Sequence, residues 1–202
     1  MLNFRKTRLA KDLRYFYISR VMARIKSAPN LVWMDLEMSG LEPERDVILE
    51  IATIVTDPNL NILAEGPVLA IHQTENVFEG MDDWNKRHHT QSGLVERCRK
   101  STLTMADADK MTLDFIKPFT IERGNVLCGN SITQDRRFLY KYMPLLTGWL
   151  NYRNIDVSSI KELTFRWYPD LPEFQKMEKH QALDDIRESI AELEYYRKTI
   201  FK

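Results

Sequence analysis

Two carboxylates that lie one residue apart, Asp35 and Glu37, follow a short apolar run of the chain. Side chains two positions apart on a strand project to the same face, so both carboxylates would enter one space at the end of the strand. Close like charges raise each other's proton affinity unless a cation lies between them. The pair therefore suits a hard divalent ion, Mg²⁺ or Mn²⁺, bound through oxygen. Taken alone, it also fits two solvated acids beside a turn.

Two further acids and a histidine extend the set. Asp135 follows Gly129-Asn130-Ser131 and falls in the first turn of an expected helix, where an acid also interacts favourably with the helix dipole. His180 and Asp185 are five residues apart, which on a regular helix separates them by about 140°. We therefore expect His180 in the loop before the last helix and Asp185 within that helix. A histidine can take a proton from an attacking water near neutral pH; an exposed histidine at a helix start is the alternative.

The order of these groups along the chain is D-x-E, then D, then H-x₄-D. Four carboxylates and a histidine at strand–helix boundaries are typical of two-metal phosphodiester hydrolases, in which ions about 3.5–4 Å apart stabilise the attacking and leaving oxygens. The sequence lacks the motifs that a nucleophilic hydrolase or a nucleotide-binding loop would require. The sequence has no G-x-S-x-G motif and no phosphate-binding glycine loop, and neither Cys98 nor Cys128 has a plausible base nearby in sequence. The pattern predicts metal-dependent hydrolysis.

The strands that must position these groups can be placed from apolar periodicity and turn signals. Residues 31–34 form a continuous apolar run, typical of a strand covered on both faces. Residues 47–56 and 62–72 are predicted as the next two strands, and their short connections favour an antiparallel meander. Two later strands are expected at residues 126–128 and 155–157.

Helices are predicted for most of the remaining chain. They cover residues 81–99 with a break at Ser92-Gly93, 104–119, 134–142 after a Thr133 cap and before Pro144, a segment that Ser158 caps and that ends at Trp167, and 181–198. In the last helix one stripe carries Leu183, Ile186, Ile190 and Leu193. The sum is an α/β fold with a mixed five-stranded sheet, a three-stranded antiparallel meander plus two parallel strands, flanked by helices.

The composition is that of an ordinary globular chain, with 44% hydrophobic and 29% charged residues. No apolar run approaches the roughly 18 residues of a membrane span. The two cysteines lie far apart and form neither a disulfide framework nor a zinc-binding pattern. We therefore expect a soluble, cytoplasmic protein with reduced thiols and no membrane partner.

The formal net charge of zero hides an asymmetry. Residues 1–28 hold eight of the 29 basic side chains and one of the 29 acidic ones, which leaves 21 basic and 28 acidic side chains, a charge of −7, in residues 29–202. An acidic body is a poor partner for a long polyanion, so any nucleic acid bound should be short. Residues 29–202 are predicted to be a single domain. The basic segment fits a membrane-surface, transit-like or nucleic-acid-binding helix, or a dispensable extension with Met22 as an alternative start.

Five long stretches of the sequence resemble the oligoribonucleases, which belong to the DEDDh family of 3′→5′ exonucleases and to the ribonuclease H-like fold. The stretches are LVWMDLEMSGLEPERDVILEIATIVTD, NILAEGP, MDDWNKRHHTQSGLVERC, GNSITQDRRFLYKYMP and HQALDDIRESIAELEYYR. They span residues 31–200 almost without interruption, whereas residues 1–21 lie outside the resemblance. The few departures are Thr133, Leu150, Asn151 and the loop at residues 169–179.

The resemblance implies an activity and a catalytic set. Two Mg²⁺ or Mn²⁺ ions would be held by Asp35, Glu37, Asp135 and Asp185. His180 would be the general base that activates the attacking water. Hydrolysis would start at the 3′ end and release 5′-mononucleotides from RNA of a few nucleotides, dinucleotides especially. The family also implies a homodimer.

The resemblance extends to side chains that would contact the substrate. Leu41 would wedge between two bases and Trp84 would stack on one; without the resemblance, a core or surface-anchoring tryptophan would be the better interpretation of Trp84. The 5′-phosphate would be held by His89, Ser131 and Ser158. Tyr152 and Arg153 would come from the partner subunit, and the planar fork of an arginine suits phosphate oxygens.

Two alternatives stay open. The chain could be a 3′→5′ exonuclease that trims longer RNA or DNA ends, although an acidic body and a capped 5′-phosphate would oppose a long strand. It could also be a catalytically silent binding module of the same fold, although such a module has no physical need to crowd four carboxylates together.

Overall fold

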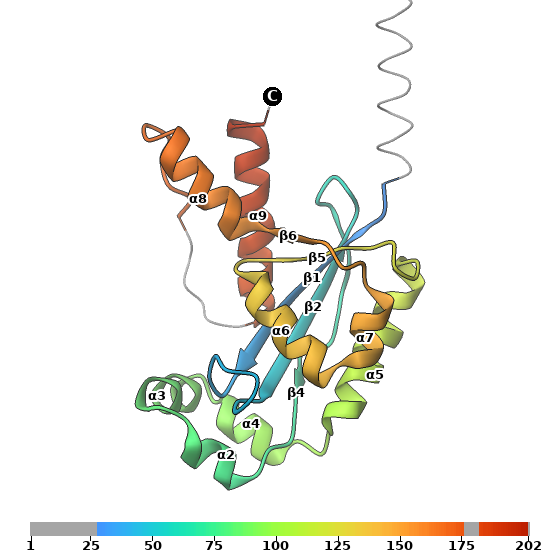
Figure 1. Cartoon of the computed structure of the whole chain (residues 1–202), viewed down its shortest axis with the longest axis vertical. Coiled ribbons are helices and arrows are strands. Elements are labelled where there is room, and N and C mark those ends of the chain that lie inside the picture. The colour runs from blue at the N-terminus through green and yellow to red at the C-terminus, as the bar shows by residue number, and fades with distance from the viewer. Residues whose placement is uncertain (1–27, 176–181, 202) are drawn as a thin grey trace, which may run out of the picture.

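The sheet is built around β1 (Leu31–Met38) and β2 (Ile48–Thr56), which pair antiparallel. The computed structural model describes residues 28–175 and 182–201, and Figure 1 shows these two strands crossing the middle of the molecule. On one side, β5 (Leu127–Gly129) runs parallel to β1, and β6 (Asn154–Asp156) runs parallel to β5. On the other side, β2 pairs antiparallel with β3 (Ile62–Glu65) and β4 (Leu69–Ala70). The predicted mixed sheet is confirmed, but it has six strands within the described residues and not five.

The extra strand arises because the expected third strand, residues 62–72, is divided into β3 and β4. Pro67 lies between them, and a proline has no amide hydrogen to donate to a neighbouring strand. Gly66 donates its amide hydrogen to the Thr53 carbonyl at 2.8 Å, and a Cβ at this glycine would lie 2.9 Å from that oxygen. The Gly66-Pro67 step therefore gives β2 two short partners in place of one long one.

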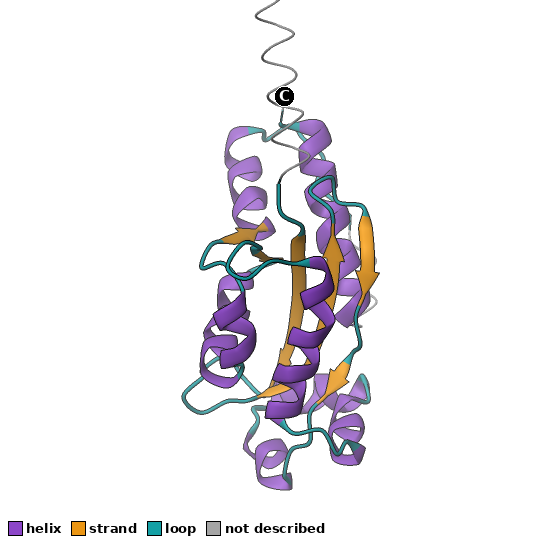
Figure 2. Ribbon diagram, turned by 90° about the vertical axis from the view of Figure 1, so that its right-hand side faces the viewer, coloured by secondary structure: helices purple, strands orange, loops and turns teal. Residues whose placement is uncertain are grey.

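Helices flank the sheet in both views (Figures 1 and 2). They are α2 (Glu75–Gly80), α3 (Asp83–Gln91), α4 (Leu94–Lys100), α5 (Met105–Ile116) with the 3₁₀ turn η1 (Lys117–Phe119), α6 (Ile132–Tyr142), α7 (Pro144–Trp149), α8 (Val157–Trp167) and α9 (Ala182–Thr199). The predicted break at Ser92-Gly93 is confirmed between α3 and α4, where Gly93 has a left-handed φ of 73°. The short helices α2 and α7 are additions to the sequence prediction.

Two helix caps differ from the prediction. α6 begins after Ser131, whose φ of 50° is left-handed, so Thr133 lies inside the first turn and does not cap the helix. α8 is capped by Asp156, whose side chain accepts a hydrogen bond from the Ser158 amide, so Ser158 is a helical residue. α6 ends at Tyr142, before Pro144, as predicted, and Pro144 itself opens α7, where its missing amide hydrogen costs little. Each difference moves a boundary and leaves the predicted element in place.

The side chains of β1 alternate between two hydrophobic clusters. The cluster under α5, α6 and α7 receives Val32, Met34 and Leu36. Trp33 points to the other face, where it packs with side chains of α8 and α9. The stripe predicted on α9 is confirmed, since the same cluster contains Leu183, Ile186, Ile190 and Leu193. Asp35 and Glu37 continue the odd-numbered side of β1, so they face α9.

Both cysteines are buried and neither forms a disulfide, as predicted. Burial raises the pKa of the Cys98 thiol to about 11 and also raises the pKa of Cys128, so both favour the neutral form. In the described part of the chain, no helix combines the length and the apolar character that crossing a bilayer requires.

Asp109 of α5 holds the start of α7. It is 2% exposed, and its two carboxylate oxygens accept hydrogen bonds from the Leu145 and Leu146 amides at 2.9 Å each. We expect Asp109→Ala to lower the free energy of unfolding by about 1–3 kcal/mol, because two amides at a helix start lose their acceptor. Urea unfolding measures the change. Asp114→Ala on the same helix removes only exposed ion pairs and should cost much less than Asp109→Ala; equal losses would contradict the role of Asp109.

Candidate active site

Strand β1 and helix α9 bring three carboxylates together. Asp35 and Glu37 lie on β1, and Asp185 lies in the first turn of α9. One carboxylate oxygen from each of the three lies within 4.8 Å of the others. In Figure 1 the tip of β1 lies between α3 and the end at which α9 begins. Three of the acids chosen from the sequence therefore share one space.

Asp135 joins this group from the first turn of α6. Its Oδ1 accepts a hydrogen bond from the Leu36 amide at 3.0 Å, which fixes the carboxylate beside the residue between Asp35 and Glu37. That edge of β1 faces β5, which has already ended at Gly129. The Asp135 carboxylate therefore takes the place of the strand partner that this amide lacks.

Proton affinity in this group is strongly perturbed. Burial raises the pKa of Glu37 to about 7, and the neighbouring carboxylates of Glu50 and Asp185 act in the same direction. Burial also raises the pKa of Asp135 to about 7, against the lowering effect of the Leu36 hydrogen bond. Buried carboxylates this close to one another are costly as anions unless a cation compensates them. An all-oxygen donor set of this kind fits a hard divalent ion.

His89 of α3 lies against Glu37. It is 2% exposed, its Nε2 is 2.9 Å from the Met38 carbonyl oxygen, and its Nδ1 is 3.8 Å from the Glu37 carboxylate. Because a carbonyl oxygen can only accept, Nε2 must carry the proton and Nδ1 presents a lone pair toward Glu37. Burial lowers the pKa of His89, which favours the neutral ring. The structure thus places this histidine directly beside the acids.

Ser131 and Ser158 meet where β5 and β6 end. Their hydroxyl oxygens are 3.2 Å apart, and the Ser131 amide donates to the Ser158 hydroxyl at 2.9 Å and to Asp156 at 3.0 Å. The two serines predicted to share a role are therefore neighbours. Their contacts place them together at the sheet end but do not connect them to His89.

Leu41 and Trp84 line one cleft of about 980 Å³. The cleft lies between the turn after β1 and helices α2 and α3, and each of these two side chains is 64% exposed. The Trp84 indole stacks on the His88 ring, with centroids 4.8 Å apart and planes within 8°. A cleft with large exposed apolar side chains suits planar ligands such as bases.

Tyr152 and Arg153 stand in the loop between α7 and β6. Tyr152 is 71% exposed, and the Arg153 guanidinium lies 5.0 Å from the centre of its ring. The described contacts do not bring this pair to the acids of its own chain. His180 lies outside the described residues, as do residues 176–179 before it. The role predicted for His180 therefore stays a prediction.

A buried ion pair beside Glu37 was not singled out from the sequence. Glu50 of β2 is the cross-strand partner of Glu37 and is 3% exposed. Arg97 of α4 donates to both Glu50 carboxylate oxygens at 3.0 Å each. An acid within the apolar run ILEIATIVT is a sequence signal for a buried partner, because lone charges avoid such strands. The identity of that partner depends on contacts that the sequence pattern does not contain.

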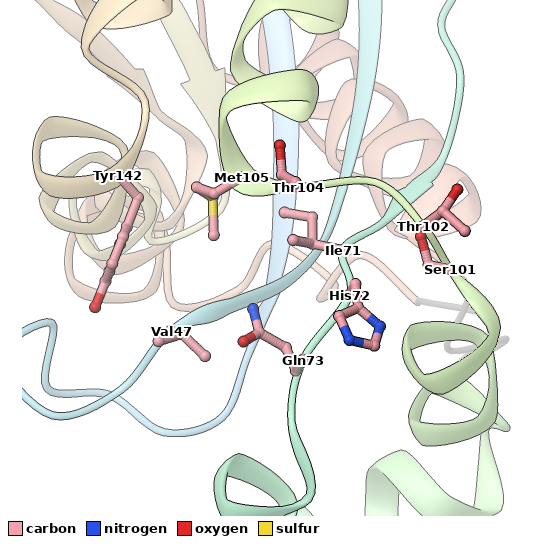
Figure 3. A pocket seen from close by; sticks show the side chains of 9 residues that line it. All are labelled: Val47, Ile71, His72, Gln73, Ser101, Thr102, Thr104, Met105 and Tyr142. Carbon is pink, nitrogen blue, oxygen red and sulfur yellow. The ribbon is translucent and has the colours of Figure 1, made fainter.

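A separate cavity of about 540 Å³, shown in Figure 3, lies between the chain after β4 and the start of α5. His72, Gln73 and Ser101 face it. The Gln73 amide donates to the Ile48 carbonyl and the Ser101 hydroxyl to the Ala70 carbonyl, so these polar groups hold the local chain. None of the four acids lines this cavity, and it is not the candidate active site.

Comparison with solved structures defines the fold. The chain matches exonuclease I from Methylocaldum szegediense with a TM-score of 0.66 at 20% identity, covering 87% of this chain and 42% of that one. It matches Escherichia coli exonuclease I in complex with a dT13 oligonucleotide with a TM-score of 0.65 at 16% identity, covering 86% of this chain and 42% of that one. The chain therefore spans less than half the length of these proteins, with which it shares the ribonuclease H-like fold.

The exonuclease family model RNase_T matches residues 32–193. Together with the fold, this match places the chain among the exonucleases. Curated oligoribonucleases are much more similar in sequence than these solved structures. The oligoribonuclease of Pseudomonas aeruginosa PAO1 is 58% identical over 179 residues, covering 88% of this chain and 99% of the relative. That of Shewanella loihica is 59% identical over 174 residues, covering 86% and 96%. The chain belongs to the oligoribonuclease family.

The raised pKa values of Glu37 and Asp135 predict how metal and pH act on stability. Between about pH 4 and 7 the folded state holds protons on these carboxyls that the unfolded chain has released, so metal-free stability falls through this window and stays low above it. Divalent ions bind the deprotonated carboxylates. We expect Mn²⁺ to raise the thermal unfolding midpoint more at about pH 8 than at about pH 5.5. Scanning fluorimetry with and without EDTA measures this.

Asp135→Asn is the matched variant, because it keeps an acceptor for the Leu36 amide and removes the charge. Without metal at about pH 8, it should be more stable than the parent by about 1–3 kcal/mol, since a tenfold change in proton affinity is worth about 1.4 kcal/mol. Mn²⁺ should stabilise it less than the parent. An undiminished gain from Mn²⁺ in this variant would contradict the assignment of Asp135 to the metal-binding group.

Proposed function

We propose that this chain is a 3′→5′ exoribonuclease that degrades short oligoribonucleotides, dinucleotides especially, to 5′-mononucleotides. The observation that carries the proposal is the meeting of Asp35, Glu37 and Asp185 within 4.8 Å, beside an Asp135 bonded to the same strand. The chain matches oligoribonucleases over 96–99% of their own length. The charge of −7 over residues 29–202 supports a short substrate, because an acidic surface gains little from contacts to many phosphates.

Two divalent ions, Mg²⁺ or Mn²⁺, would be held by Asp35, Glu37, Asp135 and Asp185. When bound, they supply the positive charge that stabilises the attacking and leaving oxygens of the phosphodiester. The chain's own contribution is to hold the four carboxylates in place and to release their protons. The raised pKa values of Glu37 and Asp135 support this role, because ionisation of both is difficult without a compensating charge.

His180 would take the proton from the attacking water. It precedes Asp185 by five residues in the sequence. A neutral imidazole can accept a proton at physiological pH, whereas the carboxylates are occupied with the ions. His180 would thus be the general base, and the catalytic set would consist of four acids and one histidine.

Substrate contacts would lie on both sides of the acids. Leu41 and Trp84, exposed in one cleft, would separate and stack the bases. The hydroxyl pair of Ser131 and Ser158 would bind the 5′-phosphate. His89 would join them with a proton on Nδ1, because its Nε2 hydrogen is donated to the Met38 carbonyl. A phosphate held in this way leaves no passage for further nucleotides on the 5′ side, which favours dinucleotides over long strands.

Residues 29–202 would form one exonuclease domain, with residues 1–28 outside it. The family match to residues 32–193 supports this division. The domain would act as a homodimer, in which Tyr152 and Arg153 of one chain reach the site of the other. Support comes from the exposure of Tyr152, whose ring the Arg153 guanidinium accompanies at the surface.

Substrate length tests the proposed activity. With Mn²⁺ and a mixture of 5′-phosphorylated RNAs from dinucleotide to 20-mer, the dinucleotide should be consumed fastest, as measured by chromatography of the products. Asp185→Ala should lose about 10³-fold or more of this activity. Asp184→Ala removes only the neighbouring ion pair with Arg187 and should retain most of it. A preference for the 20-mer would support a trimmer of longer strands, and an active Asp185→Ala would refute the site.

Mixing of variants tests the homodimer. Arg153→Ala and Asp185→Ala should each be nearly inactive alone. If Arg153 serves the partner's site, a reassociated mixed dimer has one site with both groups intact, so an equal mixture should recover about a quarter of the parent rate. If Arg153 serves its own chain, the mixture gains nothing. Size-exclusion chromatography with light scattering gives the oligomeric state of each sample.

A further inference from the structure

Glu37 belongs to two groups of metal-binding side chains that differ in chemistry. In the first, its neighbours are Asp35 and Asp185, and every donor is a carboxylate oxygen. In the second, its neighbours are His88 and His89 of α3, and one ligand atom from each of the three lies within 4.8 Å of the others. The second group therefore offers two imidazole nitrogens and one carboxylate oxygen.

His89 supplies the independent sign that this second group is built for a ligand. It is 2% exposed, and its Nδ1 has no hydrogen-bond partner among the described residues. Its Nε2 must donate to the Met38 carbonyl, so the Nδ1 lone pair is aimed at the Glu37 carboxylate 3.8 Å away. A buried lone pair that faces a carboxylate needs a proton or a metal ion between the two atoms. A cation placed between them would satisfy both groups.

We propose that Glu37, His88 and His89 form a binding site for a Zn²⁺-class ion, separate from the all-oxygen group and sharing Glu37 with it. Three protein ligands of nitrogen and oxygen type, with a fourth position left for water, are a common zinc arrangement. Bonds of 2.0–2.2 Å in a tetrahedron place ligand atoms about 3.3 Å apart. The 3.8 Å between His89 and Glu37 reaches this spacing with a small rotation of either side chain.

The neighbourhood of His88 is compatible with ligation. Its ring stacks on Trp84 with planes within 8°, and it lies 5.5 Å from the His89 ring at 70°. Stacking covers the face of an imidazole, whereas a metal bond forms in the ring plane at a nitrogen. The stack is therefore compatible with a metal bond at a ring nitrogen. Imidazole nitrogen favours Zn²⁺ and its neighbours among the transition metals over Mg²⁺.

The shared carboxylate has a functional consequence, which rests on the proposed exonuclease activity. An ion bound by His88, His89 and Glu37 draws Glu37 away from Asp35 and Asp185. Zn²⁺ should then inhibit the enzyme that Mg²⁺ or Mn²⁺ activates, and the inhibition should act through α3. Binding itself does not depend on any RNA substrate.

The test uses the metal alone with the full chain. Co²⁺ is titrated into metal-free protein and its visible absorption is recorded, since tetrahedral nitrogen and oxygen ligation gives an intense band; Zn²⁺ affinity is measured by competition with a chromophoric chelator. His88→Phe keeps a ring for the Trp84 stack and removes the donor, and should weaken Zn²⁺ binding at least tenfold. His88→Gln should do the same. His72→Phe, at an exposed histidine of the other cavity, should leave the affinity unchanged.

Three outcomes would overturn the site: an unchanged Zn²⁺ affinity in both His88 variants, an equal loss in His72→Phe, or a loss confined to His180→Phe, which would place the ion elsewhere. Inhibition is measured separately, as the Zn²⁺ concentration that halves the rate on dinucleotide in Mg²⁺. A rise of at least tenfold in this concentration for His88→Phe supports the sharing of Glu37. Zn²⁺ binding that weakens in the His88 variants but does not inhibit the parent supports the site and overturns the sharing. A protein inactive on RNA leaves the binding result intact.

Discussion

Carboxylates that repel one another are held in fixed positions at the tip of β1, and the remainder of the site is arranged around this repulsion. Asp35 and Glu37 stand on a strand whose antiparallel partner β2 is buried over its whole length. Asp185 stands on a helix packed against the same face, and Asp135 is tied to the strand through the Leu36 amide. Rigid attachments prevent the acids from moving apart into solvent, so the repulsion is relieved by protonation or, when the acids are ionised, by a bound cation.

The register of β1 decides which side chains meet. Val32, Met34 and Leu36 enter the cluster under α5, α6 and α7, and this leaves the odd-numbered residues to face α9. A slip of one residue would turn the two acids into the apolar cluster under α5, α6 and α7, so the hydrophobic pattern strongly disfavours it. The geometry of the acids is therefore set by residues that take no part in the chemistry.

Features that follow from local periodicity could be predicted from the sequence, and features that depend on distant contacts could not. The placement of Asp35 and Glu37 on one face requires only the two-residue period of a strand, and Asp135 in a first helical turn requires only the turn before it. By contrast, the cap of α8 and the division of the third strand at Gly66-Pro67 depend on single bonds and close contacts. The lone pair of His89 beside Glu37 joins residues far apart in sequence, which no periodicity reveals.

Two further acids lie next to the four that would bind ions, and each of the two is paired with an arginine. Glu50 lies directly across the ladder from Glu37, yet both of its oxygens are bonded to Arg97. Asp184 precedes Asp185, yet it pairs with Arg187, which also bonds to Glu65. A guanidinium remains charged at any physiological pH and its planar fork orients the carboxylate, so each pairing offsets part of the negative charge that these two acids add near the group. The negative charge presented to divalent ions is thus limited by pairing as well as by the number of acids nearby.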